Sequence, residues 1–177
     1  MTNLDPQDEQ LIHDGRRFKV HRARFGPDRT REWVSAPASV AVVAYDDTSV
    51  YLVRQPREAV QRDDVLELPA GIMDVPGESP QQTARRELIE EIGMDASEWA
   101  EATSFFASIG FTDEIVHVFL ATGLTKVGDP DESGEEQIEV VAWPLDALDA
   151  LIDGNTDAKT LIGLLWLRRA RLLGGSA

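Results

Sequence analysis

Residues 71–94, GIMDVPGESPQQTARRELIEEIGM, contain the most clearly bounded helix that the sequence predicts. Ser79 can cap its N-terminus, and Gln82 lies three residues later, which is the spacing of a capping box. Pro80 fits the first helical position, where its missing N–H costs nothing. Gly93 ends the helix, because glycine readily takes the left-handed conformation that follows a last turn. We therefore expect a helix over residues 80–92.

This helix has two chemically different faces. An apolar row at i, i+4 spacing can pack on a sheet and consists of Ala84, Leu88 and Ile92. Glu87, Glu90 and Glu91 project from another side, because residues three and four apart are neighbours on a helix. Three carboxylates within one turn repel, so they form either a solvated acidic face or a seat for divalent cations, which take oxygen ligands. Arg86 lies beside them and partly neutralises the cluster.

Strand patterns surround the helix on both sides. Upstream they cover residues 18–25, 31–35, 39–45, 49–54 and 65–69, and downstream residues 102–107, 115–121 and 138–143. Two further helices are expected at residues 147–153 and 158–173, while residues 1–15 read as a polar lead-in. This order predicts an α/β (α+β) fold in which helices sandwich a mixed sheet. We assign residues 1–36 to the lead-in and a β-hairpin, and residues 37–177 to the main domain.

The net charge of −15 in 177 residues limits the partners of the protein. The first 31 residues carry a net charge of +2, and the remaining residues carry −17. So acidic a body repels phosphate backbones, which argues against nucleic acid or an anionic membrane as the main partner. A small anionic ligand stays compatible with this charge if a cation mediates its binding.

Cysteine is absent, so the chain has no disulfide framework, thiolate metal site or cysteine nucleophile. The N-terminal segment MTNLDPQDEQ has no apolar signal core. No apolar run approaches the ~18 residues of a membrane-spanning helix. These features together favour a cytoplasmic protein.

The carboxylate cluster and its surroundings resemble the Nudix box, G-x5-E-x7-R-E-U-x-E-E-x-G-U with U aliphatic. The matching residues are Gly71, Glu78, Arg86-Glu87-Leu88, Glu90-Glu91 and Gly93-Met94. One departure is that six residues, rather than five, separate Gly71 from Glu78.

The flanks are similar to the ADP-ribose pyrophosphatase branch of that family, over roughly residues 16–170. They comprise Leu52-Val53-Arg54-Gln55, Leu66-Glu67-Leu68-Pro69-Ala70-Gly71, Gly110-Phe111-Thr112-Asp113-Glu114 and Asp157-Ala158-Lys159-Thr160-Leu161. A second departure is Ile109, since those enzymes usually carry a proline there.

The resemblance implies a Nudix α/β/α sandwich and water attack on the phosphorus of a nucleoside diphosphate. It assigns Mg²⁺, with Mn²⁺ as the alternative, to Glu87, Glu91 and the carbonyl oxygen of Ala70. Glu90 would help to hold metals or orient ligands, and Arg86 belongs to the same catalytic set. Such cations neutralise the pyrophosphate and lower the pKa of a water molecule.

A general base is also implied, because similar enzymes use a glutamate from a loop before the last strand. The register with residues 138–140 favours Glu136 as this base, with Glu135 as the alternative. The other interpretation of this run is a solvated acidic loop.

Four residues are candidates for substrate binding. Trp33 is the best match to aromatics that stack on the base in related enzymes, and Phe18 is a second candidate. A hydrophobic plug within the hairpin is the other interpretation of both aromatics. Arg57 aligns with an arginine that contacts phosphates in relatives, although Arg54 competes for this role and simple surface solvation also fits. Ile72 can line the pocket or pack within its loop.

The function implied by these features is Mg²⁺-dependent hydrolysis of ADP-ribose, or of a close nucleoside diphosphate sugar, to AMP and ribose 5-phosphate. The alternatives are a Nudix hydrolase of NADH, a dinucleoside polyphosphate or GDP-mannose, and a nucleotide sensor without hydrolytic activity. We expect a homodimer that pairs or exchanges its N-terminal hairpins, with a nucleoside diphosphate compound as the small-molecule partner.

Overall fold

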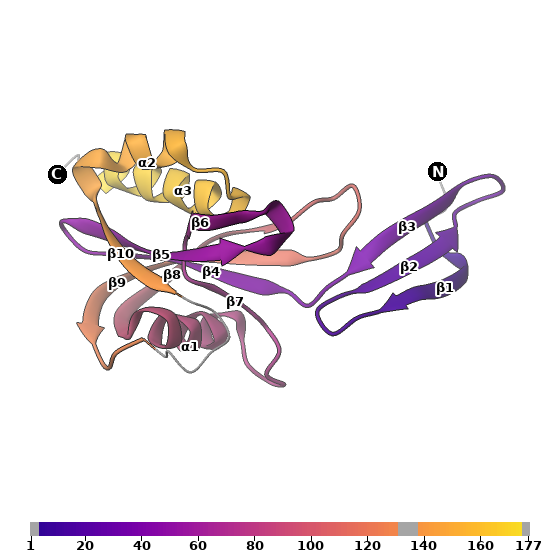
Figure 1. The fold of residues 1–177 in the computed structure, drawn as a ribbon, viewed down its shortest axis with the longest axis horizontal. Coiled ribbons are helices and arrows are strands. Elements are labelled where there is room, and N and C mark those ends of the chain that lie inside the picture. The colour runs from indigo at the N-terminus through magenta and orange to yellow at the C-terminus, as the bar shows by residue number, and fades with distance from the viewer. Residues whose placement is uncertain (1–3, 131–137, 175–177) are drawn as a thin grey trace.

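A computed structural model describes residues 4–130 and 138–174. Its body contains a sheet of seven strands with helices on both faces (Figure 1). The strands are β4 (Ser39–Tyr45), β5 (Ser49–Arg57), β6 (Arg62–Glu67), β7 (Ala70–Ile72), β8 (Met94–Phe106), β9 (Ile115–Lys126) and β10 (Glu139–Pro144). Their order is β10-β5-β4-β9-β8, with β6 paired to β5 and β7 paired to β4. The pair β4–β9 is parallel and the others are antiparallel, which confirms the mixed sheet.

The central strand β4 is buried on both of its faces. Its residues 40–44 have no solvent exposure, as expected for a continuous apolar run between two layers of helix. Val40 and Val42 pack toward one core with Leu88 of the helix α1 (Pro80–Ile92). Ala41 and Val43 face the opposite core, which contains Leu164 and Leu167 of the helix α3 (Ala158–Gly174). The predicted α/β/α sandwich is therefore confirmed.

Helix α1 has the bounds that the sequence predicts. The Ser79 Oγ accepts a hydrogen bond from the Gln82 N–H at 3.3 Å, and the Ser79 N–H donates to Gln82 Oε1 at 2.8 Å. Gly93 ends the helix with a φ of 73°. The apolar row is buried, so this face fixes the rotation of the helix against the sheet.

The other face of the sheet is covered by α3 and by the helix α2 (Leu148–Gly154). Gly163 lets α3 approach closely, because a Cβ there would lie 2.5 Å from Leu68 Cδ1 and 2.8 Å from Val43 Cγ2. Short 3-10 turns occur at Glu58–Val60 and Leu145–Ala147.

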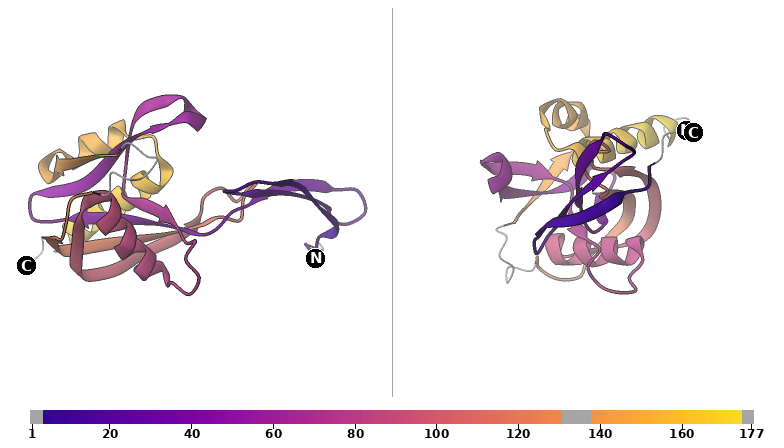
Figure 2. Two further views of the ribbon diagram at one scale, coloured as in Figure 1. Left: turned by 60° about the horizontal axis from the view of Figure 1, so that its bottom comes forward. Right: turned by 90° about the vertical axis from the view of Figure 1, so that its right-hand side faces the viewer.

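A separate sheet at the N-terminus projects away from the sandwich (Figure 2). It contains β1 (Gln7–Asp14), β2 (Lys19–Arg24) and β3 (Thr30–Ser35). The predicted hairpin is present, and the predicted polar lead-in contributes a further strand, because β1 pairs with β2. Val34 joins this sheet to the body, since its N–H donates to the Phe111 carbonyl at 2.7 Å.

Two strands differ from the predicted ones in ways that affect the site. β8 starts at Met94, directly after α1, instead of at residue 102. The predicted strand 65–69 ends at Glu67, and the chain then continues into β7, which pairs with β4. No helix in residues 4–130 and 138–174 has the length and apolar character needed to cross a membrane.

Candidate active site

Helix α1 presents two carboxylates to the backbone of β7. The Ala70 N–H donates to Glu91 Oε2 at 3.0 Å, and Glu91 is buried. The carboxylate of Glu87 lies directly against Gly71, where a Cβ would come within 2.5 Å of all three carboxylate atoms. Glycine at residue 71 is therefore what allows Glu87 and Glu91 to meet the same short strand.

Arg86 is bonded to the acidic groups around this strand. Its Nη1 donates to Glu87 Oε1 at 2.7 Å and to Glu90 Oε2 at 3.0 Å. Its Nε donates weakly to Glu78 Oε2 at 3.4 Å. Its Nη2 is buried without a hydrogen-bond partner among the described residues, and it lies 3.5 Å from Asp74 Oδ1. Arg86 thus bridges the carboxylates of Glu87 and Glu90, while one of its buried donors has no hydrogen-bond partner among the described residues.

The burial of these groups changes their acidity. Burial raises the pKa of Glu87, an effect that the neighbouring Glu90 strengthens and that Arg86 partly offsets. Burial alone would lower the pKa of Arg86, but the charges of Glu87, Glu90 and Glu78 raise it overall. A cation placed beside Glu87 would favour the ionised form of this carboxylate and oppose the effect of burial on its pKa.

The predicted metal-ligating glutamates are engaged in hydrogen bonds within the protein. Within the described residues, no group of three or more His, Cys, Asp or Glu side chains is arranged to hold an ion. Arg86 engages Glu87 and Glu90, while the Ala70 N–H engages Glu91. The donor set is nonetheless chemically suitable for a hard divalent cation, since all its ligand atoms are oxygens.

The substrate candidates lie at three different cavities. Phe18 and Ile72 line one cavity of about 430 Å³ between the N-terminal sheet and the body. Trp33 lines a second cavity, of about 370 Å³, which shares Phe111 and Thr112 with the first. Arg57 lines a third, of about 490 Å³, beside β6. The structure therefore brings Phe18 and Ile72 together and separates Arg57 from them.

Trp33 is held by aromatic neighbours within the N-terminal sheet. His21 stacks on its ring with centroids 5.2 Å apart and an interplanar angle of 14°. Phe25 contacts the ring edge-on at 6.0 Å. The Nδ1 of His21 lies 2.8 Å from Glu9 Oε1, a residue of β1. Trp33 is thus a rigid aromatic surface whose orientation is set before any ligand binds.

Glu67 lines the same cavity as Arg57 and is not among the site residues that the sequence predicts. It is almost fully buried, with 2% of its surface exposed, and it accepts hydrogen bonds from Arg57 and Lys159. Burial alone would raise the pKa of Glu67, but the hydrogen bond from Arg57 and the charge of Lys159 lower it overall. The signal in the sequence was a lone carboxylate inside the short apolar run Val65–Pro69.

The proposed general bases, Glu136 and Glu135, lie outside the described residues. The adjoining strand β10 pairs with β5, where Glu139 lies opposite Arg54. Arg54 forms an ion pair with Glu139 at 3.1 Å, so its side chain is directed at β10. Both candidates for a phosphate contact are therefore paired with a glutamate, Arg54 with Glu139 and Arg57 with Glu67.

Comparisons with known proteins identify the family and match the fold. The family model described as NUDIX domain matches residues 35–165. An ADP-ribose pyrophosphatase of Mycobacterium tuberculosis is 41% identical over 139 residues, which cover 76% of this chain and 67% of that protein. An ADP-ribose pyrophosphatase of Bacillus subtilis is 38% identical over 147 residues, covering 81% and 78%. A crystal structure of an ADP compounds hydrolase has a TM-score of 0.82 over 98% of this chain and 96% of that one; at 21% identity it supports the fold alone.

Proposed function

This chain belongs to the NUDIX family, and on that premise we propose that it is an ADP-ribose pyrophosphatase. The reaction is hydrolysis of the pyrophosphate bond of ADP-ribose, or of a close nucleoside diphosphate sugar, to AMP and ribose 5-phosphate. The observation that carries the proposal is the pair Glu87 and Glu91, placed by α1 against the backbone of Ala70 and Gly71. Two ADP-ribose pyrophosphatases that are 41% and 38% identical to this chain support the substrate.

Members of this family generally use divalent metal ions. We assign Mg²⁺ to Glu87, Glu91 and the Ala70 carbonyl oxygen, with Glu90 as a further ligand, and Mn²⁺ can take the same oxygen ligands. When bound, the cation supplies polarisation of the phosphoryl oxygens and a more acidic water molecule. Gly71 supports this assignment, because a side chain there would fill the space that the Glu87 carboxylate occupies.

The residues of α1 have distinct roles in the proposed reaction. Arg86 holds Glu87 and Glu90 in place through its Nη1, while its buried Nη2 is a donor available to an anionic ligand. Glu91 joins α1 to β7, because its carboxylate accepts a hydrogen bond from the Ala70 N–H. Glu136 accepts the proton from the attacking water, with Glu135 as the alternative base.

The remaining residues bind the substrate. Trp33 stacks on the base, because its ring is already oriented and lines a cavity. Phe18 and Ile72 form walls of the neighbouring cavity, and Ile72 directly follows Gly71. Arg57 contacts the pyrophosphate, for which its planar fork of donors is suited.

We further propose a cytoplasmic homodimer joined through the N-terminal sheet. Apolar side chains are exposed on this sheet and on the loop that faces it, and Ile109 is 87% exposed. The exposed set includes Leu4, Leu11, Ile12, Phe18, Ile109 and Phe111. Leu4, Ile109 and Phe111 line one cavity, and exposed apolar patches mark interaction sites. The strongly acidic body supports a small-molecule substrate rather than nucleic acid or a membrane as partner.

A substrate panel tests the proposal. Purified protein and Mg²⁺ are incubated with ADP-ribose, NADH, a diadenosine polyphosphate and GDP-mannose, and a phosphatase releases phosphate from any monoester formed. We expect ADP-ribose to have the highest kcat/KM, and mass spectrometry to identify AMP and ribose 5-phosphate. A higher kcat/KM for another compound would move the assignment within the family, whereas tight binding of ADP-ribose without turnover would indicate a sensor.

A further inference from the structure

Glu67 lies at the centre of a buried network of ion pairs. At the end of β6, its carboxylate accepts two hydrogen bonds from one edge of Arg57, from Nε at 2.6 Å and from Nη2 at 3.0 Å. It accepts another from Lys159 Nζ, near the start of α3. A bidentate bond of this kind fixes the plane of a guanidinium as well as its position.

The network continues into the backbone that leads to the site. Lys159 Nζ also donates to Asp157 Oδ2 at 2.9 Å, and Asp157 accepts a second bond from Thr160 Oγ1 at 2.7 Å. The hydroxyl of Thr160 accepts from the Leu68 N–H at 2.8 Å. Leu68 is two residues before Ala70, so one connected set of bonds holds both Arg57 and the approach to β7.

Stability alone does not explain a buried carboxylate between two cations. Removing such ions from water is costly, and apolar residues of similar size often stabilise a fold equally well. The ion pairs instead fix the orientation of the Arg57 guanidinium. This group is bonded to Glu67 and lines a cavity of about 490 Å³. Lys159 lines the same cavity, while its own charge is engaged by Glu67 and Asp157.

We propose that Glu67 is a positioning residue, which holds the Arg57 guanidinium in the orientation that binds the pyrophosphate of the substrate. This inference rests on the proposed function, in which Arg57 contacts the pyrophosphate. Glu67 itself touches no substrate atom and acts only through Arg57. Its loss therefore weakens substrate binding without removing any group from the metal-binding side of α1.

A double-mutant cycle tests this role. Glu67→Gln keeps the shape of the side chain but removes the charge, and Arg57→Met removes the guanidinium. Each single change is expected to raise KM for ADP-ribose about 10-fold, with kcat changed less than about 3-fold. Because Glu67 acts through Arg57, the double variant should have the KM of Arg57→Met alone. Multiplied effects, about 100-fold in the double variant, would show that Glu67 acts independently and overturn the proposal.

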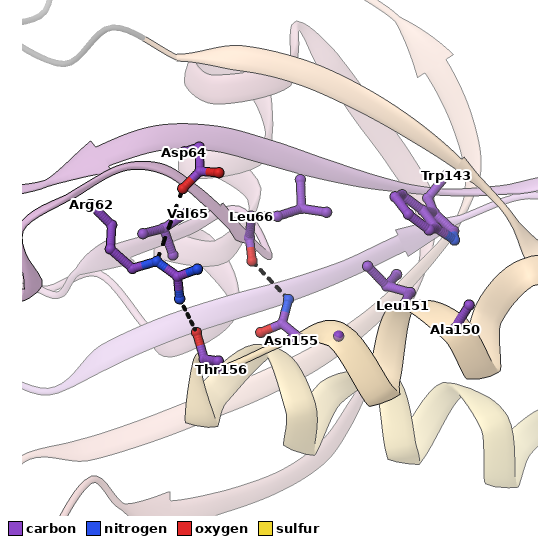
Figure 3. Close-up of a pocket in the computed structure, with 10 residues that line it drawn as sticks. Arg62, Asp64, Val65, Leu66, Trp143, Ala150, Leu151, Asn155 and Thr156 are labelled. Carbon is purple, nitrogen blue, oxygen red and sulfur yellow. Dashed lines mark hydrogen bonds and ion pairs between the residues drawn. The ribbon is translucent and has the colours of Figure 1, made fainter.

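Arg62 provides a matched control in the same cavity. Its Nη1 donates to Thr156 Oγ1 at 3.2 Å and its Nε lies 4.0 Å from Asp64 Oδ1, contacts that Figure 3 draws in a second pocket that Arg62 also lines. Arg62 is therefore bonded to the loop before α3. Arg62→Met removes one positive charge from the cavity wall and is expected to leave KM within about 2-fold of the wild type. A rise equal to that of Arg57→Met would indicate a general charge effect and contradict a positioned guanidinium.

A third variant keeps the test decisive if Glu67→Gln fails to fold. Arg57→Lys preserves the charge but lacks the planar fork, so its KM should rise as much as that of Arg57→Met. A wild-type KM for Arg57→Lys would overturn the proposal. Failure of this proposal is distinct from failure of the proposed function, because a wild-type protein without activity on ADP-ribose refutes the function first. Unchanged KM values in an active enzyme refute only the role of Glu67.

Discussion

Gly71→Ala tests whether catalysis requires the close contact of the Glu87 carboxylate with the backbone of Gly71. The added methyl group would lie within 2.5 Å of the Glu87 Cδ, Oε1 and Oε2, whereas real Cβ contacts essentially never fall below 3.0 Å. The backbone of Gly71 is not in the left-handed region, so alanine meets no conformational penalty there. The three atoms nearest to the added methyl group are therefore those of the Glu87 carboxylate.

The size of the effect follows from this geometry. The carboxylate must retreat by at least about 1.4 Å, from 2.0 Å to the 3.4 Å of ordinary van der Waals contact, and a displacement of about 1 Å at a catalytic group already costs on the order of 100-fold in rate. Stability should fall by only about 1 kcal/mol, because the displaced atoms are the end of a flexible side chain. We expect kcat/KM for ADP-ribose to drop about 100-fold while the protein stays folded at 25 °C.

Phosphatase-coupled turnover measures the activity, and thermal unfolding followed by circular dichroism measures the stability. Gly154→Ala is the matched control, because a Cβ at this residue meets no atom within 4 Å. It should leave both quantities near those of the wild type. If Gly71→Ala kept kcat/KM within about 3-fold of the wild type, the close contact between Gly71 and Glu87 would not be needed for catalysis.

Three further predictions concern stability. Hydrogen bonds led by the one from the Thr48 N–H lower the pKa of Asp46 to about 2, so its contribution is present above its ordinary value of 3.8 and is lost as the pH falls through about 2; urea unfolding of Asp46→Asn should show a deficit at pH 6 that disappears near pH 2. Gly163→Ala should cost about 1–3 kcal/mol in urea unfolding, because its Cβ meets Leu68 Cδ1 at 2.5 Å, and a neutral effect would contradict the close packing of α3. Ser79→Ala should cost about 1 kcal/mol in thermal unfolding through loss of the cap of α1, whereas an unchanged Tm would mean that the cap is not important.

The elements that the sequence predicts well carry local signals. Helix α1 begins and ends as expected, because Ser79, Gln82 and Gly93 mark its ends independently of the rest of the chain. Strand β4 is equally clear, since a short run of valines and alanines favours a buried strand, and this run is buried. Both elements form the frame of the site, which explains why its helix and central strand could be anticipated.

The missed elements depend on pairing rather than on burial. The strand β1 is polar and mostly exposed, and only its backbone bonds to β2 make it a strand. The first half of β8 likewise lacks a clean alternation, and a register shift between Glu101 and Thr103 interrupts it. The bonds of Glu67 to Arg57 and to Lys159, the latter 92 residues away, form only when the fold brings their elements together. Contacts of this kind leave no periodic trace in the sequence.

Replacing Glu91 by glutamine tests whether the Glu91 carboxylate is a ligand of the catalytic cation. Glutamine can still accept the hydrogen bond from the Ala70 N–H, but it lacks the negative charge. The measurement is kcat for ADP-ribose at saturating Mg²⁺, alongside a thermal unfolding curve that verifies the fold. We expect Glu91→Gln to lower kcat by at least about 100-fold with little change in Tm, since several kcal/mol of transition-state stabilisation depend on the bound cation. Wild-type turnover by Glu91→Gln would contradict the assignment of the metal ligands and, with it, the proposed mechanism.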